Sequence, residues 1–214
     1  MLGLGIGAKL GAAPVIAPEE FHVVLDAGHG GRDGGASVDG VNEAELNLQI
    51  VKVLAQTLRQ RGCTVSLTRV DANSLNSLLA PNKKVDDMNK RREKIRQLNP
   101  DLVISIHLNA YPDRTVQGLQ CFYANETPGS KDYATAIQEQ FNASELPIDK
   151  QVKPTDFNLV EHSPCPAVLI ECGFLTNPRE RQLLQLPTYQ QILAYHITAG
   201  VLTARHKTQT VRVC

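Results

Sequence analysis

The sequence predicts a single α/β domain with a twisted, mostly parallel sheet and helices on both faces. From Phe21 onward, short apolar runs alternate with helical segments, which is the pattern of strands joined by helical crossovers. Several of these runs are continuously apolar, as in strands covered on both faces. A length of 214 residues with 42% hydrophobic residues suits one domain with a full core.

The first strand and helix are the most clearly marked elements. FHVVLDAG, which begins at Phe21, is the expected first strand, and NEAELNLQIVKVLAQTLRQRG is the expected first helix. Asn42 suits the N-cap of this helix, Glu45 follows three residues later as in a capping box, and Gly62 suits the C′ position. We therefore expect this helix to span about 43–61.

The same alternation continues to the end of the chain. In chain order we expect a strand TVSLTR, a loop over 71–84, a helix DDMNKRREKIRQLN that ends before Pro100, strands DLVISIHLNA and GLQCFYA, a helix over about 130–142, a strand PAVLIECGF, a helix that starts with Asn177, Pro178 and Glu180, and a last helix over about 188–205. The expected domain covers residues 21–206, and residues 207–214 form a tail.

Charge and composition exclude several classes of protein. Lys and Arg number 22, as do Asp and Glu, so no basic excess points to a nucleic-acid partner. No apolar run reaches the roughly 18 residues that a membrane span needs. Residues 1–20 are the remnant of a signal or anchor segment or a disordered end. The five cysteines lack CxxC spacing and are expected to be free thiols.

Ionisable residues end three of the predicted strands. His29 follows the first strand in LDAGHGGRDGGA, His107 lies near the end of DLVISIH, and Glu171 ends PAVLIE. Glu43 opens the first helix, and helix N-termini lie at the same edge of a parallel sheet as the strand ends. Two histidines and one carboxylate, with an open fourth position, form a catalytic zinc pattern, and a second carboxylate can act on water.

Each of these residues also has a plain structural explanation. A lone histidine is usually a satisfied core or edge residue, and Glu43 could simply favour the helix dipole. Glu171 is harder to explain in this way, because a carboxylate in an apolar strand is costly unless it is paired or metal-bound. The glycines of GHGGRDGG do not form a phosphate cradle, since GxGxxG and GK[ST] are both missing. Periodicity and spacing alone therefore leave a metal site at the sheet edge as one hypothesis beside these structural explanations.

Four segments together resemble one enzyme family. LDAGHGGRDGGA, NEAELNL, ISIHLNA and PAVLIECGFLTNPRE are similar, in this order, to the signature blocks of the zinc-dependent N-acetylmuramoyl-L-alanine amidases, the amidase_3 family. The resemblance covers about residues 21–204. It implies one zinc ion held by His29, Glu43 and His107, and it implies that Glu171 is the catalytic glutamate. It also implies a twisted, mostly parallel sheet flanked by helices.

The resemblance further implies a reaction and a setting. The reaction is hydrolysis of the amide between the lactyl group of N-acetylmuramic acid and L-alanine of the stem peptide, with Glu171 as the proton carrier. KKVDDMNKRREKIRQLNPDLVISIHLNAY is similar to the spore germination amidases, which act on cortex peptidoglycan. We expect peptidoglycan as the substrate, a protein activator as a candidate partner, and an extracytoplasmic location in the cell wall, periplasm or forespore intermembrane space. Contact with a membrane would come only through an N-terminal anchor.

Several alternatives stay open at this level. Glu45 is a rival for the role of Glu43, although residues two apart on a helix point to different sides. Asp26 could orient a metal ligand or serve only as a hydrogen-bonding strand end. Asn109 could bind substrate or cap a turn, and His162 could face the cleft. For Arg92 we expect a structural role, and for His22, His196 and His206 a surface or core role.

Cys172 and the glycines next to His29 complete the expectations. Cys172 should point away from the metal because it follows Glu171 directly in a strand. Gly28, Gly30 and Gly31 should let the backbone bend beside the metal. The rival functions are a non-catalytic peptidoglycan-binding scaffold and a zinc exopeptidase, and for the latter the sequence lacks a motif for a second metal.

Overall fold

The computed structural model describes residues 20–144 and 150–213, with side chains up to residue 208. These residues form a six-stranded sheet, a two-stranded hairpin and the helices around them. In chain order the elements are β1 (Phe21–Ala27), β2 (Ser37–Val38), β3 (Val41–Asn42), α1 (Glu43–Gln60), β4 (Cys63–Leu67), α2 (Lys83–Leu98), β5 (Leu102–Asn109), β6 (Gln120–Ala124), α3 (Ser130–Asn142), β7 (Lys153–Thr155), α4 (Asn158–Glu161), β8 (Ala167–Phe174), α5 (Pro178–Leu184) and α6 (Pro187–Val213).

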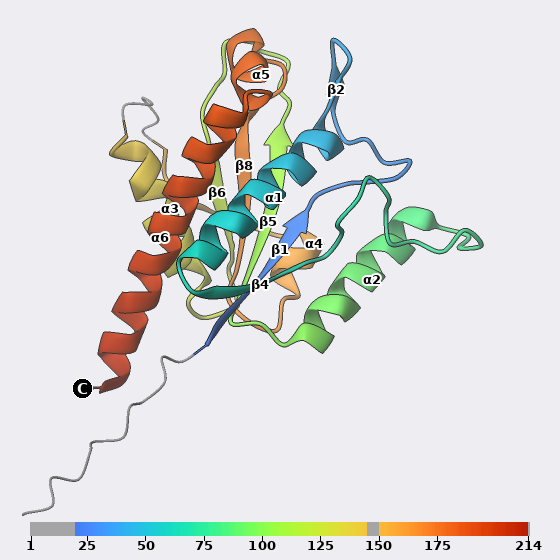
Figure 1. Cartoon of the computed structure of the whole chain (residues 1–214). Coiled ribbons are helices and arrows are strands. Elements are labelled where there is room, and N and C mark those ends of the chain that lie inside the picture. Colours follow the sequence, from blue (N-terminus) through green and yellow to red (C-terminus); the bar gives the residue numbers. More distant parts are fainter. Residues whose placement is uncertain (1–19, 145–149, 214) are drawn as a thin grey trace, which may run out of the picture.

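The large sheet has the strand order β4-β1-β5-β8-β6-β7. Strands β4, β1, β5 and β8 run parallel to one another, while β6 pairs antiparallel with β8 and parallel with β7. Figure 1 shows α1, α3 and α6 on one side of this sheet and α2 beyond its opposite side. The predicted fold, a mostly parallel sheet with helices on both faces, is confirmed.

The face covered by α1, α3 and α6 carries the main core. Alternate strand residues such as Leu25, Ile104 and Ile170 are fully buried there against apolar stripes of the three helices. Strand alternation sends every second side chain to this face. Because each large apolar side chain buried in this way contributes about 1.5–3 kcal/mol, this face supplies most of the stabilising burial.

The face covered by α2 and α4 has a much smaller apolar cluster. Val24, Val103 and Leu169 of the strands meet Ile95 of α2 and Leu159 of α4. Further along the same strands, toward their carboxyl ends, this face carries polar side chains, including Asp26, Ser105 and His107, all of them buried. The functional site must therefore lie on the side of α2.

The short elements differ most from the sequence expectations. The β2–β3 hairpin, β7 and α4 lie in segments where no regular structure was expected, and each has only two to four residues. Strand β7 forms through its pairing with β6, and α4 forms where its Leu159 packs into the smaller cluster. Helix α2 starts at Lys83, three residues before the expected start at Asp86. Helix α6 continues to Val213, beyond its expected end near residue 205.

The helix ends agree only partly with the capping signals. Asn177 caps α5 through hydrogen bonds from two backbone N–H groups, and Gly62 adopts the left-handed conformation just after α1. Asn42 does occupy the N-cap of α1, but its side chain makes no capping hydrogen bond. The expected capping box is wrong, because Glu45 is exposed and Glu43 turns its carboxylate to the backbone of Ala36 instead.

The expectation of free thiols is confirmed for the cysteines that the structure describes. Cys63, Cys121, Cys165 and Cys172 are free thiols, while Cys214 lies outside the described residues. None of the helices in the described ranges combines the length and apolar character that a membrane crossing needs. Residues 1–19, which include nearly all of the expected signal or anchor segment, also lie outside the described residues.

Candidate metal centre and active site

His29 sits in a sharply turned loop directly after β1. Its backbone is in the left-handed region, with φ 61°, and Gly30 and Gly31 follow with φ of 134° and 63°. Left-handed backbone is strained for a histidine and easy for glycine. The glycines therefore allow the chain to turn back at once, as expected, and the turn directs the His29 ring toward α1.

Glu43, in the first turn of α1, is the centre of the cluster. One carboxylate oxygen, Oε2, accepts a hydrogen bond from the Ala36 N–H at 2.9 Å. The other, Oε1, accepts from the Leu108 N–H at 3.1 Å and the Asn47 amide at 3.3 Å. Although burial opposes ionisation, the contacts with His107 and His29 and the Ala36 hydrogen bond hold the pKa of Glu43 well below its usual range. Glu45 lies exposed on the other side of the helix.

Both histidine rings meet this one carboxylate. His29 Nε2 lies 3.2 Å from Glu43 Oε1, and His107 Nδ1 lies 3.1 Å from the same atom. One donor atom from each of the three residues falls within 4.8 Å of the others. The structure thus brings together the three side chains that the sequence pattern selected, from β1, α1 and β5.

The backbone near His107 is shaped to admit its ring. A Cβ atom added at Gly28 would lie 2.3 Å from a carbon of this ring, so only glycine fits there. The second ring nitrogen, Nε2, is buried and has no hydrogen-bond partner among the described residues. A buried polar atom without a partner is costly and marks a place where a ligand or ion can bind.

Glu171 lies on β8 directly beside His107 of β5 in the strand register. Its Oε2 atom is buried without a hydrogen-bond partner in the described chain. Burial is the main cause that raises its pKa to about 7, with the charge of Glu43 adding to this and the two histidines opposing it. The next residue, Cys172, belongs to the main core on the opposite face of the sheet. Glu171 therefore adjoins the cluster while Cys172 points away from it, as strand alternation requires.

Asp33 is a residue of the site that the sequence analysis missed. Its carboxylate lies 3.0 Å from His29 Nδ1, the ring nitrogen that does not face Glu43. Although burial opposes protonation, the Glu43 and Asp33 carboxylates on either side raise the pKa of His29 to about 9. A carboxylate behind a histidine is the usual way to fix the ring orientation of a metal ligand. The only available signal was its spacing of four residues from His29.

Arg91 of α2 is a second residue that was missed. Its buried guanidinium lies 2.7 Å from Asp26 Oδ1 and donates hydrogen bonds to the backbone carbonyls of Ala27 and His29, at 2.7 and 2.5 Å. Asp26 also accepts hydrogen bonds from the hydroxyls of Thr68 and Ser105. Asp26 thus acts through Arg91, which clamps the loop that carries His29.

Arg69 completes this support from the other side of the loop. Its guanidinium donates to the backbone carbonyls of Ala27, Gly28 and Ala44. Arg92, the arginine that we singled out on α2, instead donates a hydrogen bond to Asn89 on its own helix. The contact of Arg92 within its own helix agrees with a structural role for this residue. The α2 arginine that supports the site is Arg91, which the sequence analysis did not select.

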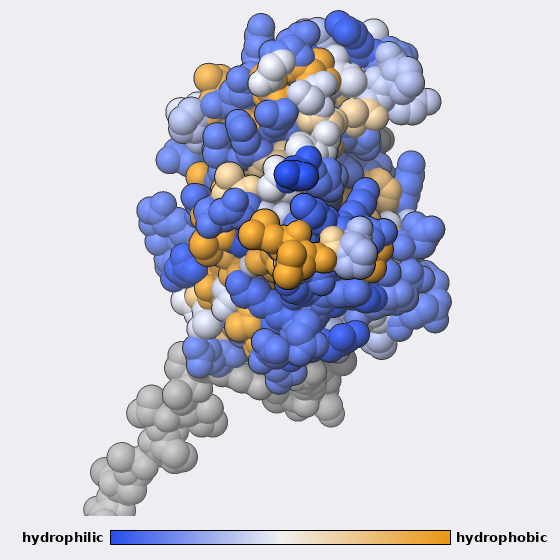
Figure 2. Space-filling view, turned by 90° about the vertical axis from the view of Figure 1, so that its right-hand side faces the viewer, coloured by the Kyte–Doolittle hydropathy of each residue, from blue (hydrophilic) through white to orange (hydrophobic). Residues whose placement is uncertain are grey.

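A cavity of about 870 Å³ opens onto the cluster. His29, His107, Phe157 and residues of the 71–82 loop line it. Figure 2 looks onto the side of the molecule where α2 lies, and an apolar patch stands out there among hydrophilic residues. The exposed apolar residues of the 71–82 loop are Leu78 and Leu79, and Leu78 also lines the cavity. The loop that looked featureless in the sequence thus forms a wall of the site.

The other candidate residues lie apart from the cluster. Asn109 ends β5, and its backbone carbonyl accepts a hydrogen bond from Leu175. His162 is exposed at the C-cap of α4 and is absent from the cavity lining. His22 contacts Ser66 at the amino end of the sheet, and His196 packs against Phe141 on the opposite face.

Comparison with known proteins identifies the family. The profile of the N-acetylmuramoyl-L-alanine amidases, Amidase_3, matches residues 23–203. The chain belongs to this family. The amidase is accordingly a hydrolase that acts on peptidoglycan, and the four sequence blocks that suggested the family lie within the matched residues.

Individual relatives agree with the family match. The germination-specific N-acetylmuramoyl-L-alanine amidase of Bacillus subtilis is 33% identical over 188 residues, which cover 84% of this chain and 78% of that protein. The amidase LytC of the same organism is 29% identical, but the match covers only 36% of its length. The CwlD amidase from Clostridioides difficile, solved in complex with the GerS lipoprotein, superposes with a TM-score of 0.84 at 34% identity, covering 87% of this chain and 99% of that one.

Proposed function

We propose that the amidase is zinc-dependent and that His29, Glu43 and His107 hold one zinc ion. The residues fit such an ion in three respects: their donor atoms converge, the buried Nε2 of His107 lacks a partner, and two histidines with one carboxylate are a zinc ligand set. A zinc ion held there would supply Lewis acidity, which activates water and polarises a carbonyl group.

The proposed role of Glu171 is proton transfer. Its carboxylate would accept a proton from the attacking water and then pass it to the nitrogen of L-alanine, so that the leaving group departs as an amine. A pKa of about 7 suits this task, because the group can both take up and release a proton near neutral pH. Asp33 would hold the His29 ring in place from behind.

The proposed substrate is the amide between N-acetylmuramic acid and L-alanine in spore cortex peptidoglycan. The cortex assignment rests on the similarity to the germination-specific amidase of Bacillus subtilis. Because the CwlD amidase was solved with a lipoprotein, we also propose that a protein partner activates this enzyme. Such a substrate requires an extracytoplasmic location. The proposed catalytic domain spans residues 21–206, with residues 1–20 as a signal, anchor or disordered segment and α6 continuing into the 207–214 tail.

The observation that carries the proposal is the convergence of His29, Glu43 and His107 beside Glu171. A non-catalytic peptidoglycan scaffold would need neither this cluster nor the two histidines in the lining of a cavity. A zinc exopeptidase is disfavoured because this trio is the only group of metal-ligating side chains found among the described residues, which argues against a second metal there.

The metal assignment is tested with a pair of variants on α1. Glu43→Ala removes a ligand and should abolish zinc binding, whereas Glu45→Ala, two residues away and exposed, should keep one zinc per chain. Zinc content is measured by elemental analysis on folded protein. Full zinc occupancy in Glu43→Ala together with loss in Glu45→Ala would reverse the assignment.

The substrate assignment is tested by mass spectrometry of purified muropeptides. Vegetative and cortex-type material are incubated separately with the zinc-loaded protein. Release of intact stem peptide is the expected result, with cortex-type material cleaved faster. Peptide release by stepwise loss of single amino acids would instead favour the exopeptidase, and no release from either material would favour the scaffold.

A further inference from the structure

Four cationic side chains line the cavity next to the metal centre: Arg32, Lys83, Lys84 and Arg91. Three carboxylates line the cavity as well. Asp26 and Asp87 form ion pairs with Arg91, and Asp33 lies 3.0 Å from His29. Arg32, Lys83 and Lys84 make no ion pair within residues 20–144 and 150–213. We call these three residues the cationic rim.

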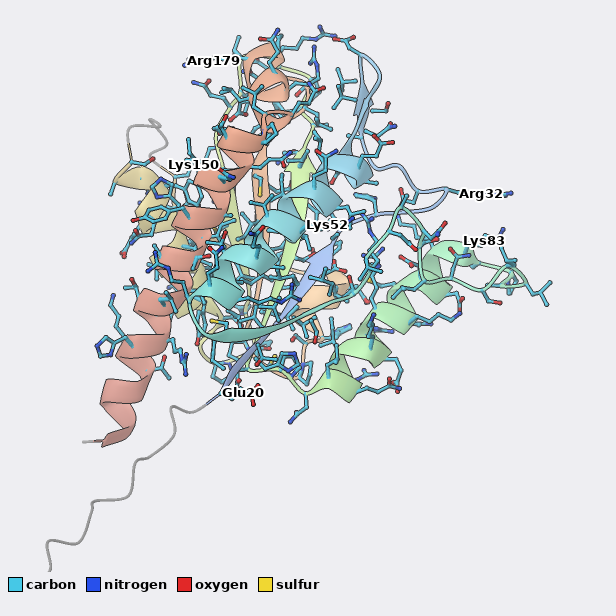
Figure 3. The ribbon with its side chains drawn as sticks, viewed as in Figure 1. Glu20, Arg32, Lys52, Lys83, Lys150 and Arg179 are labelled. Carbon is cyan, nitrogen blue, oxygen red and sulfur yellow. The ribbon has the colours of Figure 1, made fainter. Side chains whose placement is uncertain are left out.

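The rim comes from two separate elements. Arg32 belongs to the loop after β1, and the lysines open α2. Figure 3 shows Arg32 and Lys83 on the same side of the molecule, whereas Lys52 on α1 and Arg179 on α5 lie elsewhere. All three cations line the same cavity as His29 and His107.

The rim is a local feature of a neutral protein. The chain has zero formal net charge, so an unpaired positive cluster is not a consequence of a generally basic surface. A nucleic acid or another long polyanion would need positive charge over an extended surface. Three cations confined to the lining of one cavity instead suit a small anionic group that enters the cavity with the substrate.

We propose that the cationic rim binds a carboxylate of an acidic residue in the peptide part of the substrate. This inference rests on the proposed function, in which the amide of L-alanine lies at the metal centre. The residue after L-alanine then lies no more than about 7 Å further along the peptide, since each residue spans at most about 3.6 Å. Arg32 can bind a carboxylate through two parallel hydrogen bonds, and the lysines add point charges.

The rim thereby sets specificity at the second residue of the stem peptide. An acidic side chain there meets the rim, whereas its amide counterpart has the same size and no charge. The enzyme should discriminate between the two through binding, because the two substrates differ in charge at the second residue and not at the scissile bond.

The test uses two soluble muropeptides that differ only in glutamate or glutamine after L-alanine. The zinc-loaded enzyme is compared with Lys84→Gln, Arg32→Gln and the triple variant that also carries Lys83→Gln. For the glutamate substrate, KM should rise about two- to fivefold for each cation removed, with kcat nearly unchanged, because exposed ion pairs have modest energies. KM for the glutamine substrate should not respond to the variants. Added salt should shrink the difference between the substrates.

Lys52→Gln and Arg179→Gln are the matched controls, since both residues are exposed and lie away from the cavity. Equal KM for the two substrates in the parent enzyme, or equal losses for both in the triple variant, would overturn the proposal. Rim variants that lose affinity only for an anionic wall polymer would also overturn it.

A binding measurement separates this inference from the proposed function. The peptides Ala-Glu-Lys and Ala-Gln-Lys, both beginning with L-alanine, are titrated into the full chain by calorimetry, without any need for cleavage. If the glutamate peptide binds more tightly and this difference is lost in Arg32→Gln and Lys84→Gln, the carboxylate-binding role of the rim is supported, even if no amidase activity is found. Equal binding of the two peptides rejects the rim even if the amidase activity is confirmed.

Discussion

The two faces of the sheet are built from the same strands but differ in composition and role. On β8, Ile170 and Cys172 enter an apolar core, while Glu171 between them adjoins the cluster of His29, Glu43 and His107. On β5, Ile106 is buried in the core and His107 faces Glu43. One face stabilises the fold by excluding water, and the other holds ionisable groups in fixed positions.

The polar face can carry these groups because they neutralise one another. Asp26 is fully buried, yet Arg91 and two hydroxyls hold its pKa below the usual value against the effect of burial. A buried charge without such partners would cost several kcal/mol. A substitution on the polar face should therefore affect mainly metal binding or catalysis. A substitution on the apolar face should affect mainly the stability of the fold.

Glu171→Gln should have the largest effect on activity. If turnover did not fall, the contrast between a catalytic face and a stabilising face of the sheet would be wrong. Turnover should fall by about 10²–10⁴-fold, because a glutamine cannot take up the proton. Fold and zinc content should stay at the parent level, whereas His29→Ala should lose zinc and activity together. Zinc per chain and amide cleavage are measured side by side. A zinc-free or nearly fully active Glu171→Gln would remove Glu171 from the role of general base.

Arg91→Met tests whether the ion pair on the polar face supports both stability and the site. Leaving Asp26 buried without its partner should lower the free energy of unfolding by about 3–5 kcal/mol. Zinc affinity should fall by about 10–100-fold, because the loop that carries His29 loses its clamp. Denaturant titration and zinc titration at low temperature measure the two effects.

Arg96→Met is the control for Arg91→Met, since Arg96 lies on the same helix with an exposed side chain. It should change stability by less than about 0.5 kcal/mol. An Arg91→Met protein that folds and binds zinc as tightly as the parent would show that the clamp is not needed.

Cys172→Ser probes the apolar face one residue from Glu171. A hydroxyl in this core should lower the free energy of unfolding by about 1–3 kcal/mol. Zinc content and turnover should stay close to those of the parent at temperatures where the variant is folded. Loss of zinc would imply a thiolate ligand and contradict the assignment of this residue to the core.

The last prediction is a pH dependence of stability in the zinc-free protein. Because burial raises the pKa of Glu171 from 4.5 to about 7, the folded state keeps a proton that the unfolded state releases. This contribution to stability is complete below pH 4.5 and is lost as the pH rises through about 7. Relative to Glu171→Gln, the parent should lose about 2–3 kcal/mol of stability between pH 5 and 8. Parallel stability curves for the two proteins would contradict the raised pKa.

The sequence by itself determined the larger elements and the members of the cluster. Long apolar runs and a helix with a clear apolar stripe are specified locally, so β1, α1, β5 and β8 lie within about two residues of their expected bounds. The meeting of His29, Glu43 and His107 followed from a general rule, since strand ends and helix starts share one edge of a parallel sheet. Helix geometry excluded only that Glu43 and Glu45 both serve as ligands. The family resemblance and the expected capping role of Glu45 favoured Glu43; the capping role is wrong, but the exposure of Glu45 agrees with the choice.

Only the tertiary structure decided which neighbours complete the site. Arg91 and Arg92 are adjacent in a basic run, and the sequence does not reveal which of them faces the sheet, because this depends on how α2 packs. Asp33 looked like one of many loop acids until the left-handed turn at His29 brought it to the ring. The 71–82 loop became a cavity wall, and α4 and β7 became regular, through contacts with distant segments. These features cannot be predicted from the local sequence, because the contacts that stabilise them are made with residues far along the chain.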